Sequence, residues 1–471
     1  MGSVHLISYC TLPIATARKN TFPGQTTRIS STGAKKQVMN KQINNKIVPI
    51  LRFPEFRDSE NWKIELFGDL FSFQVTNSFT RDNLNYDKGS VKNIHYGDIH
   101  TKFSTLFDLR EEIVPYINSS MLIDKIKLEC YCIEGDMIFA DASEDLDDVG
   151  KSIEIVHLNS EKLLSGMHTI LARQKKPKLN LGFGGHLFMS YGIRTQIQKE
   201  AQGTKVLGIS IARLSNIKVY YPQNKVEQKK ITDSLSSIED IVSAQSQKLE
   251  ALKKHKYGLM QQLFPAEGET IPKLRFPEFR NDVEWVETTM EQVADYENGK
   301  AHENDISESG KFIVVNSKFI STDGKIKKFT DKAFCIAKKE NILMVLSDLP
   351  NGRALAKCFF VGADDLYTVN QRICKITPIK AVGIMLYYTL NRNPYFLAFD
   401  DGVKQTNLKN EDVLHCPILL PKDLKEQQKI ADCISSIDEL IKTQGQKLDA
   451  LKVHKKGLMQ QLFPAISYIN K

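Results

Sequence analysis

Side chains of the kinds that hydrogen-bond to nucleic acid gather in two separate stretches of this 471-residue chain. Base edges in the DNA major groove are recognised by Arg, Lys, Asn and Gln, while Ser, Thr and Tyr also bind phosphates. The candidates in the first stretch are Lys92, Asn93, His95, Tyr96, Lys102, His168, Arg173, Gln174, Lys175 and Lys176. The candidates in the second stretch are Asn316, Lys318, Lys325, Lys327, Lys328, Arg353, Asn370, Gln371, Arg372 and Lys404. Because lysine runs are commonly only a solvated face, we expect a minority of these residues to contact DNA.

Catalytic motifs are missing from the sequence. Gly150, Lys151 and Ser152 supply the end of a phosphate-binding loop, but Asp145 stands where the first glycine is required. There is no Asn/Asp-Pro-Pro-Tyr/Phe tetrapeptide of the kind with which amino-methyltransferases hold a target base, and residues 347–350 (SDLP) are no substitute. We therefore expect a reader or a scaffold rather than an enzyme, with no cofactor bound by this chain.

Three local patterns carry weak chemical signals. The glycine-rich run 181–185 (LGFGG) lacks the strand, helix and downstream acid of a dinucleotide site, so we expect a flexible loop. His95 and His100 lie beside Asp98, but no third ligand supports a metal. The acidic run 141–148 would repel phosphate, and we expect a turn that faces away from DNA or contacts a basic partner.

The elements that must position the candidate residues include one helical segment that occurs twice. Residues 224–266 return as residues 423–465, and both copies end in GLMQQLFPA. A shorter motif, LRFPEFR followed by a Trp, also occurs twice, at 51–57 with Trp62 and at 274–280 with Trp285. The stretches between these shared blocks barely resemble each other. The chain is therefore an internal repeat with two unlike inserts.

Both helical copies carry the 4-3-4-3 apolar spacing of a coiled coil. The seam positions of the first copy are Ile231, Leu235, Ile238, Val242, Gln245, Leu249, Leu252, Lys256, Leu259 and Leu263. Those of the second copy are Ile430, Ile434, Ile437, Ile441, Gln444, Leu448, Leu451, Lys455, Leu458 and Leu462. An antiparallel pair would place Gln245 near Gln444 and fix the register at some cost in stability. The alternative is that each helix packs only on its own globular half.

Helix boundaries follow from capping residues and prolines. Asn224 with Glu227, and Asp423 with Glu426, have the spacing at which side chains accept the free amides of a first turn. Pro265 and Pro464 end the two helices because proline cannot continue an α-helix. Each seam is about 48 Å long at 1.5 Å per residue.

The inserts contain short β-rich runs separated by Gly, Asn and Asp turns. These runs are 135–140, 169–172, 206–211, 312–315, 342–346 and 373–377. Residues 164–174 resemble 367–376, and 203–222 align with 402–421, so the inserts share a fold but not a surface. The sequence predicts an α+β protein. Its two mixed α/β domains are separated by two long helices that pair as an antiparallel coiled coil, in a pseudo-twofold internal repeat.

Composition and charge set the broad class. The net charge of +8 comes from the first 54 residues, which hold eight basic residues and no acid, so the remainder is formally neutral. No apolar run is long enough to span a membrane. The eight scattered cysteines are typical of reduced thiols in the cytosol. Met39 could be the natural start, with residues 1–38 as an upstream extension.

These observations divide the chain into six segments. We expect a disordered extension at 1–50, a first variable domain at 51–222 and a first helix at 223–266. A linker and second variable domain at 267–421, a second helix at 422–466 and a tail at 467–471 complete the chain.

The order of variable domain, GLMQQLFP-ending helix, LRFPEFR-Trp linker, second variable domain and second helix resembles the specificity subunit of a type I restriction-modification system. The resemblance covers nearly the whole chain from about Met39. It implies that each variable region is a target recognition domain for one half of a split double-stranded DNA site, and that the paired helices act as a spacer. It also implies two modification subunits bringing S-adenosylmethionine and restriction subunits bringing ATP.

Two other readings remain open. An autonomous DNA-modifying enzyme would need a cofactor fold and a catalytic motif that this sequence lacks. A coiled-coil scaffold with two protein-binding domains would explain the duplicated helices equally well. The recognised DNA sequence does not follow from the sequence of the chain.

Overall fold

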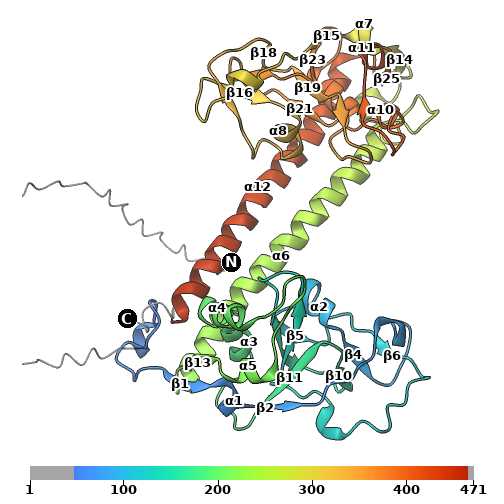
Figure 1. Ribbon diagram of the computed structural model, residues 1–471. Helices are drawn as coiled ribbons and strands as arrows, with labels where there is room; N and C mark the ends of the chain where they lie inside the picture. Colours follow the sequence, from blue (N-terminus) through green and yellow to red (C-terminus); the bar gives the residue numbers. More distant parts are fainter. Residues whose placement is uncertain (1–46, 465–471) are drawn as a thin grey trace, which may run out of the picture. The chain divides into compact units, whose positions relative to one another are not determined.

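Two mixed α/β domains and two long helices make up residues 47–464, which the computed structural model describes (Figure 1). The mixed α/β character expected from the sequence is confirmed. The possible start at Met39, nearly all of the expected extension 1–50 and the tail 467–471 lie outside these residues. In the described part, no helix is long and apolar enough to cross a membrane.

The first variable domain is built on two sheets and two short strand pairs. Its five-stranded sheet has the order β2 (Phe71–Gln74), β11 (Thr169–Gln174), β7 (Met137–Ala140), β9 (Ser152–His157) and β5 (Leu106–Asp108). Its four-stranded sheet has the order β10 (Leu163–Ser165), β4 (Lys92–Ile94), β6 (Tyr116–Ile117) and β3 (Leu84–Asn85). The strand pairs are β1 (Lys63–Leu66) with β13 (Lys218–Tyr221) and β8 (Ala142–Ser143) with β12 (Leu207–Gly208). The helices are α1 (Phe67–Leu70), α2 (Tyr96–Thr101), α3 (Phe183–Phe188), α4 (Tyr191–Glu200) and α5 (Ile211–Ser215).

The second variable domain repeats this arrangement with fewer strands. One sheet has the order β15 (Ala294–Asn298), β23 (Ile373–Pro378), β19 (Ile342–Val345) and β21 (Cys358–Phe360). The other has the order β17 (Phe329–Thr330), β16 (Phe312–Val315), β22 (Tyr367–Val369) and β18 (Ile336–Ala337). The strand pairs are β14 (Val286–Thr289) with β25 (Pro417–Leu420) and β20 (Ser347–Asp348) with β24 (Thr406–Asn407). The helices are α7 (Met290–Val293), α8 (Ser317–Ser321), α9 (Gly383–Leu390), α10 (Pro394–Leu397) and α11 (Asn410–Leu414).

Five of the six predicted β-rich runs form strands, and β16 has the predicted bounds. The run 206–211 is the exception. Only Leu207 and Gly208 pair, against the two-residue strand β8, and helix α5 begins at Ile211. Ser210 ends the strand because its side chain accepts from the amide of Arg213 and caps that helix.

The run 181–185 is not the flexible loop expected from its glycines. Gly182 has a left-handed backbone (φ +82°), and the six residues of α3 that follow are all buried. The Glu154 carboxylate accepts from the amides of Gly182 (2.9 Å) and Gly185 (2.6 Å). A Cβ at Gly185 would lie 2.7 Å from Leu106 Cδ2, so the glycine permits close packing rather than flexibility.

The two long helices have the predicted boundaries. Helix α6 spans Lys225–Leu263 and α12 spans Leu424–Leu462, with Asn224 and Asp423 as N-caps whose side chains accept from the amide two residues on. The prediction for Glu227 and Glu426 is wrong. Neither carboxylate caps its helix, because both are buried and bind arginine, as described below.

Helices α6 and α12 pack against each other in antiparallel orientation (Figure 1). Glu239 in the first half of α6 pairs with Lys455 of α12 (2.6 Å). Lys256 in the last third of α6 pairs with Asp438 in the first half of α12 (2.6 Å). Between them, the Gln444 amide donates to Gln245 Oε1 (2.5 Å). Every seam position is buried or half-buried.

Each long helix begins in one hydrophobic core and ends in the other. Ile231 and Leu235 of α6 lie in the core of the first domain, whereas Leu263 lies with Trp285 in the core of the second. Helix α12 does the reverse, since Ile430 is in the second core and Leu462 in the first. The alternative in which each helix packs only on its own half therefore does not describe this structure.

The duplicated LRFPEFR-Trp motif forms a strap across two helix ends, residues 51–62 in the first copy and 274–285 in the second. Arg52 forms a buried ion pair with Glu227 in the first turn of α6, and its neighbour Leu51 donates to the carbonyl of Gln461 near the end of α12. Arg275 and Leu274 make the same contacts with Glu426 and Gln262. Each strap thus fastens the start of one helix to the end of the other.

Candidate nucleic-acid interface

Both variable domains have one corner of the same backbone construction, where the sheet containing β7 or β19 meets the sheet containing β4 or β16. Strands β7 and β11 pair with Ala140 opposite Thr169, and β19 and β23 pair with Val345 opposite Ile373. One residue beyond each pair, the Asp141 amide donates to the His168 carbonyl (3.0 Å), and the Leu346 amide donates to the Arg372 carbonyl (2.9 Å). His168 and Arg372 are therefore equivalent positions, as are Asp141 and Leu346.

A second pair of elements completes the corner. Gly166 donates to the carbonyl of Ile94, as Asn370 donates to that of Val315 (2.9 and 3.0 Å). The next residue in each case, His95 or Asn316, is the N-cap of α2 or α8 and accepts a backbone amide with its side chain. We call the four equivalent positions the variable corner. They are His95, Tyr96, Asp141 and His168 in the first domain, and Asn316, Ser317, Leu346 and Arg372 in the second.

In the first domain, the variable corner is an aromatic cluster with one carboxylate. The Tyr96 ring lies 4.6 Å from the ring of His95 and 5.3 Å from that of His168, between ring centres. His168 Nδ1 is 3.3 Å from Asp141 Oδ1. Oδ1 is buried and has no hydrogen-bond partner within residues 47–464. The sequence-predicted residues His95, Tyr96 and His168 are thus brought together, with Asp141 added.

Charges beside this cluster are balanced by a buried aspartate. Asp98 pairs with Arg81 (2.9 Å) and Lys102 (3.0 Å). Burial opposes ionisation of Asp98, but these two cations outweigh it and hold its pKa below the usual range. Burial, aided by Arg81, also lowers the pKa of His95, so that its imidazole is neutral near pH 7. Burial raises the pKa of Asp141, which the nearby His168 opposes.

In the second domain, the variable corner carries a cation instead of a carboxylate. Arg372 is exposed and has a left-handed backbone (φ +68°). Leu346, which replaces Asp141, is buried. The side chains of Asn370 and Gln371 are already used, since they bond the His302 amide and the Glu303 carboxylate.

Several predicted contact residues of the first domain hold the domain together instead. Asn93 is completely buried, and its side-chain oxygen accepts from the Asn77 amide. Lys92 is paired with Glu161, and Arg173 forms a two-pronged pair with Asp136. Gln174 bonds both backbone groups of Leu179. These side chains form hydrogen bonds and ion pairs within the domain, and a sequence pattern does not reveal such contacts.

The predicted lysines other than Lys92, and Arg353, lie on the surface. Lys102 and Lys175 are exposed, but each has an internal partner, Asp98 and the Gly68 carbonyl respectively. Apart from Arg372, the other exposed predicted lysines and arginine are Lys176, Lys318, Lys325, Lys327, Lys328, Arg353 and Lys404. They lie on α8 and on several loops rather than in one cluster, as expected for residues that supply a diffuse positive potential.

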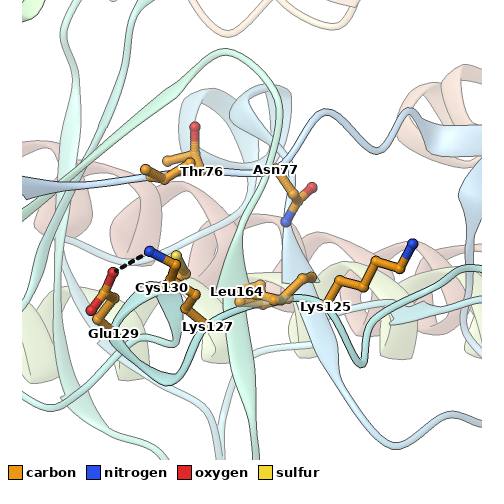
Figure 2. A pocket seen from close by; sticks show the side chains of 9 residues that line it. Thr76, Asn77, Lys125, Lys127, Glu129, Cys130 and Leu164 are labelled. Carbon is orange, nitrogen blue, oxygen red and sulfur yellow. Dashed lines mark ion pairs between the residues drawn. The ribbon is translucent and has the colours of Figure 1, made fainter.

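A separate pocket of about 320 Å³ lies beside β10, between residues 75–77 and the loop 125–130 (Figure 2). Its lining is mostly apolar, with Lys125 and Asn77 among the polar side chains. Lys127 at its edge pairs with Glu129 (3.6 Å). None of the predicted contact residues lines this pocket. Within residues 47–464, no cluster of three or more His, Cys, Asp or Glu side chains could hold a metal.

Sequence reasoning missed Asp141 as a member of the variable corner. It was grouped with the acidic run 141–148, whereas the structure places it at the end of β7 beside His168. Its contact with His168 depends on the pairing of β7 with β11, which no local sequence signal marks.

A family model for the type I restriction modification DNA specificity domain matches residues 282–453. The putative type I restriction enzyme MjaX specificity subunit of Methanocaldococcus jannaschii is 23% identical over 421 residues, which cover 86% of this chain and 93% of that protein. The type I restriction enzyme MjaVIII specificity subunit of the same organism is 23% identical over 377 residues, with 75% and 85% covered.

Solved structures show the same fold. The S subunit of a type I restriction-modification system from M. genitalium has a TM-score of 0.59 at 15% identity, covering 88% of this chain and 99% of that one. A chain from a structure of the assembly and conformational transition of the type I R-M system has a TM-score of 0.50 at 14% identity, with 86% and 97% covered. Specificity subunits are the non-catalytic members of such systems. The chain therefore carries a type I restriction modification DNA specificity domain at residues 282–453, and the resemblance to type I specificity subunits predicted from the sequence is confirmed over most of its length.

Proposed function

We propose that this chain is the DNA-recognition subunit of a type I restriction-modification complex and that each variable domain reads one half of a bipartite site. The observation that carries the proposal is the variable corner. Two domains share one backbone frame and present different side chains at the same place. A repeat with unlike corners is suited to an asymmetric DNA sequence, because sequence is read through base contacts while the backbone frame only positions them.

We propose that α6 and α12 form an antiparallel coiled-coil spacer and relate the two halves by a pseudo-twofold axis. The opposed contacts along the helices and the exchange of helix ends between the two cores support this. Each helix has 39 residues, about 58 Å at 1.5 Å per residue. One turn of DNA is about 34 Å, so the half-sites would be separated by a spacer that the protein does not contact.

Docking of two modification subunits is supported by exposed residues that are identical on α6 and α12, since packing does not explain their identity. Lys248 and Lys447, and likewise His255 and His454, are identical between the copies although they are exposed in both. The same holds for Gln247 with Gln446 and Ala251 with Ala450. A partner that binds each helix in the same way accounts for this identity. We expect S-adenosylmethionine and ATP on the modification and restriction subunits, with no cofactor on this chain.

The proposal is tested by coexpressing the chain with its modification subunit and mapping methylated positions across the host genome. We expect methylation at one bipartite motif with two different half-sites. Insertion of one heptad into both α6 and α12 should lengthen the spacer and leave both half-sites unchanged. If the half-sites changed while the spacer stayed constant, the spacer role would be refuted.

Binding to duplexes at several salt concentrations separates a DNA reader from a protein scaffold. A reader gives a specific affinity at least about 10³-fold above its non-specific affinity, which declines steeply with salt. A scaffold gives no sequence preference. That second result would overturn the proposal.

A further inference from the structure

We infer that the variable corner is a base-reading site in each domain, with opposite hydrogen-bond polarity in the two domains. In the first domain, Asp141 beside His168 accepts from an exocyclic amino group of cytosine or adenine. In the second domain, Arg372 donates to guanine. This inference rests on the proposed function and deepens it.

The backbone of the corner is the first argument. His168 (φ +58°) and Arg372 (φ +68°) both have the left-handed conformation that glycine adopts most easily. A side chain in this conformation is strained, because its Cβ lies too close to the following carbonyl oxygen. Both domains nevertheless place a polar side chain there. In each domain the carbonyl of this residue accepts the equivalent backbone hydrogen bond, and the residue immediately precedes the equivalent strand, β11 or β23. Such strain at equivalent positions points to a role for the side chain.

The carboxylate of Asp141 is the second argument. About a third of its side chain is open to solvent (32%), whereas Oδ1 is buried against His168 without a hydrogen-bond partner in residues 47–464, so the open part of the carboxylate is what an incoming amino group would meet. A carboxylate normally repels DNA, but here Arg81, Lys102 and Lys151 lie on the adjoining segments. Aspartate recognises cytosine by accepting from its N4 amino group, and the adenine N6 amino group offers the same donor.

The absence of a carboxylate at the second corner is the third argument. Leu346 occupies the position of Asp141 and its side chain is buried, so it cannot neutralise Arg372. Arg372 is exposed, and the structure gives its guanidinium no ion pair within residues 47–464. A free arginine fork matches the O6 and N7 acceptors of guanine. The difference between the corners is therefore a difference between acceptor and donor.

Four variants test the inference in the complex with the modification subunits. His168→Gly and Arg372→Gly remove the side chain and also relieve the backbone strain, so both variants should fold at least as stably as the unmodified chain. Asp141→Asn removes the charge, and Arg372→Lys keeps the charge but loses the fork. Ser160→Gly, at another exposed left-handed position (φ 59°), and Glu144→Gln, in the same acidic run as Asp141, are the matched controls.

The readout is the base preference at every position of a randomised bipartite duplex library, measured by methylation. Asp141→Asn and His168→Gly should reduce one cytosine or adenine preference in one half-site by about tenfold. Arg372→Gly and Arg372→Lys should reduce one guanine preference in the other half-site by a similar factor. The library distinguishes cytosine from adenine directly. Both controls should leave every preference unchanged.

The possible failures are distinct. If the unmodified complex shows no sequence preference, the proposed function fails. If it is specific but the four variants keep both half-sites, the variable corner does not read bases. If Asp141→Asn and Arg372→Lys weaken methylation of all sequences equally, the corner contacts only the DNA backbone, and the inference is overturned.

Discussion

The two straps share LRFPEFR and the Trp, but their buried networks differ. In the first strap, Glu227 accepts from Arg52 (2.8 Å) and from the Trp62 indole nitrogen (3.2 Å). In the second strap, Glu426 accepts from Arg275 (2.7 Å), while the Trp285 indole nitrogen is buried without a partner within residues 47–464. Both rings pack on the phenylalanine that follows a long helix, Phe463 for Trp62 and Phe264 for Trp285, but only Trp62 also packs on a phenylalanine of its own domain, Phe183 of α3.

This difference shows how the variable domains act on a shared frame. The arginine–glutamate pair depends only on residues that both copies possess, and it is reproduced. The position of the indole ring depends on the neighbouring domain, which supplies α3 only in the first half. The shared motif therefore holds the helix ends in both halves. The unlike inserts determine whether the tryptophan N–H of each motif has a hydrogen-bond partner.

The largest expected effect comes from removing the carboxylate of a strap. Glu227→Ala leaves Arg52 buried without its partner and should lower the free energy of unfolding of the first half by about 3–5 kcal/mol. Glu426→Ala should cost about 1 kcal/mol less, because Trp285 has no bond to lose. The chain has two tryptophans, one in each strap, so their fluorescence reports each half separately during denaturation.

Matched controls for this prediction are Glu55→Ala and Glu278→Ala. Both glutamates belong to the same straps but pair on the surface with Lys230 and Lys429, so each should cost less than about 1 kcal/mol. Equal losses for Glu227→Ala and Glu426→Ala would show that the indole bond contributes nothing.

The second effect is a pH dependence confined to the first half. Burial raises the pKa of Glu154 to about 7 from its usual 4.5, despite the amides of Gly185 and Gly182. The folded state therefore holds this proton more tightly than the unfolded state. The stabilisation is complete below about pH 4.5 and is lost as pH rises through 7, by at most about 3 kcal/mol.

The second half lacks this group. Its core contains buried thiols, and burial raises the pKa of Cys374 and Cys416 to about 12, so both stay neutral. Denaturation at pH 6 and pH 8 should shift the Trp62 transition and leave the Trp285 transition unchanged. Glu154→Gln should lower stability at pH 6 and remove the loss between pH 6 and 8. A shift of both transitions would contradict this assignment.

A smaller effect separates the two tryptophans themselves. Trp62→Phe removes a hydrogen bond to a charged group as well as ring volume, whereas Trp285→Phe removes volume and an unsatisfied N–H. We expect Trp62→Phe to be more destabilising by about 1–2 kcal/mol, measured by the circular dichroism of urea denaturation. The opposite order would mean that Trp285 has a partner in solution.

The sequence predicted the frame better than the site. The helix bounds and seam followed from the 3.5-residue spacing, the caps and the prolines, all of which act within a few turns of the chain. Glu227 and Glu426 were misassigned as caps because their partners, Arg52 and Arg275, are more than 150 residues away. Gly182 and Gly185 suggested mobility, but they are required by the approach of Leu106 and Glu154 from other strands.

The site depended on pairings that no local pattern reveals. Asn93 has the side chain of a base reader, but the β4 strand buries it. Asp141 looked like part of an acidic turn, but the β7–β11 register brings it to His168. The equivalence of His168 and Arg372 rests on matching backbone hydrogen bonds in the two domains.

The smallest expected effects distinguish the two ends of the helix pair. Lys256 bonds Asp438 (2.6 Å), which also accepts from the Tyr388 hydroxyl (2.7 Å). At the other end, Lys455 bonds Glu239 (2.6 Å), whose second neighbour is the buried His186 (3.7 Å). Tyrosine holds Asp438 in place, whereas burial lowers the pKa of His186 and keeps its ring uncharged near pH 7.

Double-mutant cycles should therefore give unequal coupling energies. We expect about 1 kcal/mol for Lys256→Met with Asp438→Asn, and about half that for Lys455→Met with Glu239→Gln, since partly exposed pairs contribute little unless their geometry is fixed. Both couplings should decrease in 1 M salt. Tyr388→Phe should reduce the first coupling to the value of the second. If it leaves the first coupling unchanged, the difference between the two ends has another origin than the hydroxyl that holds Asp438.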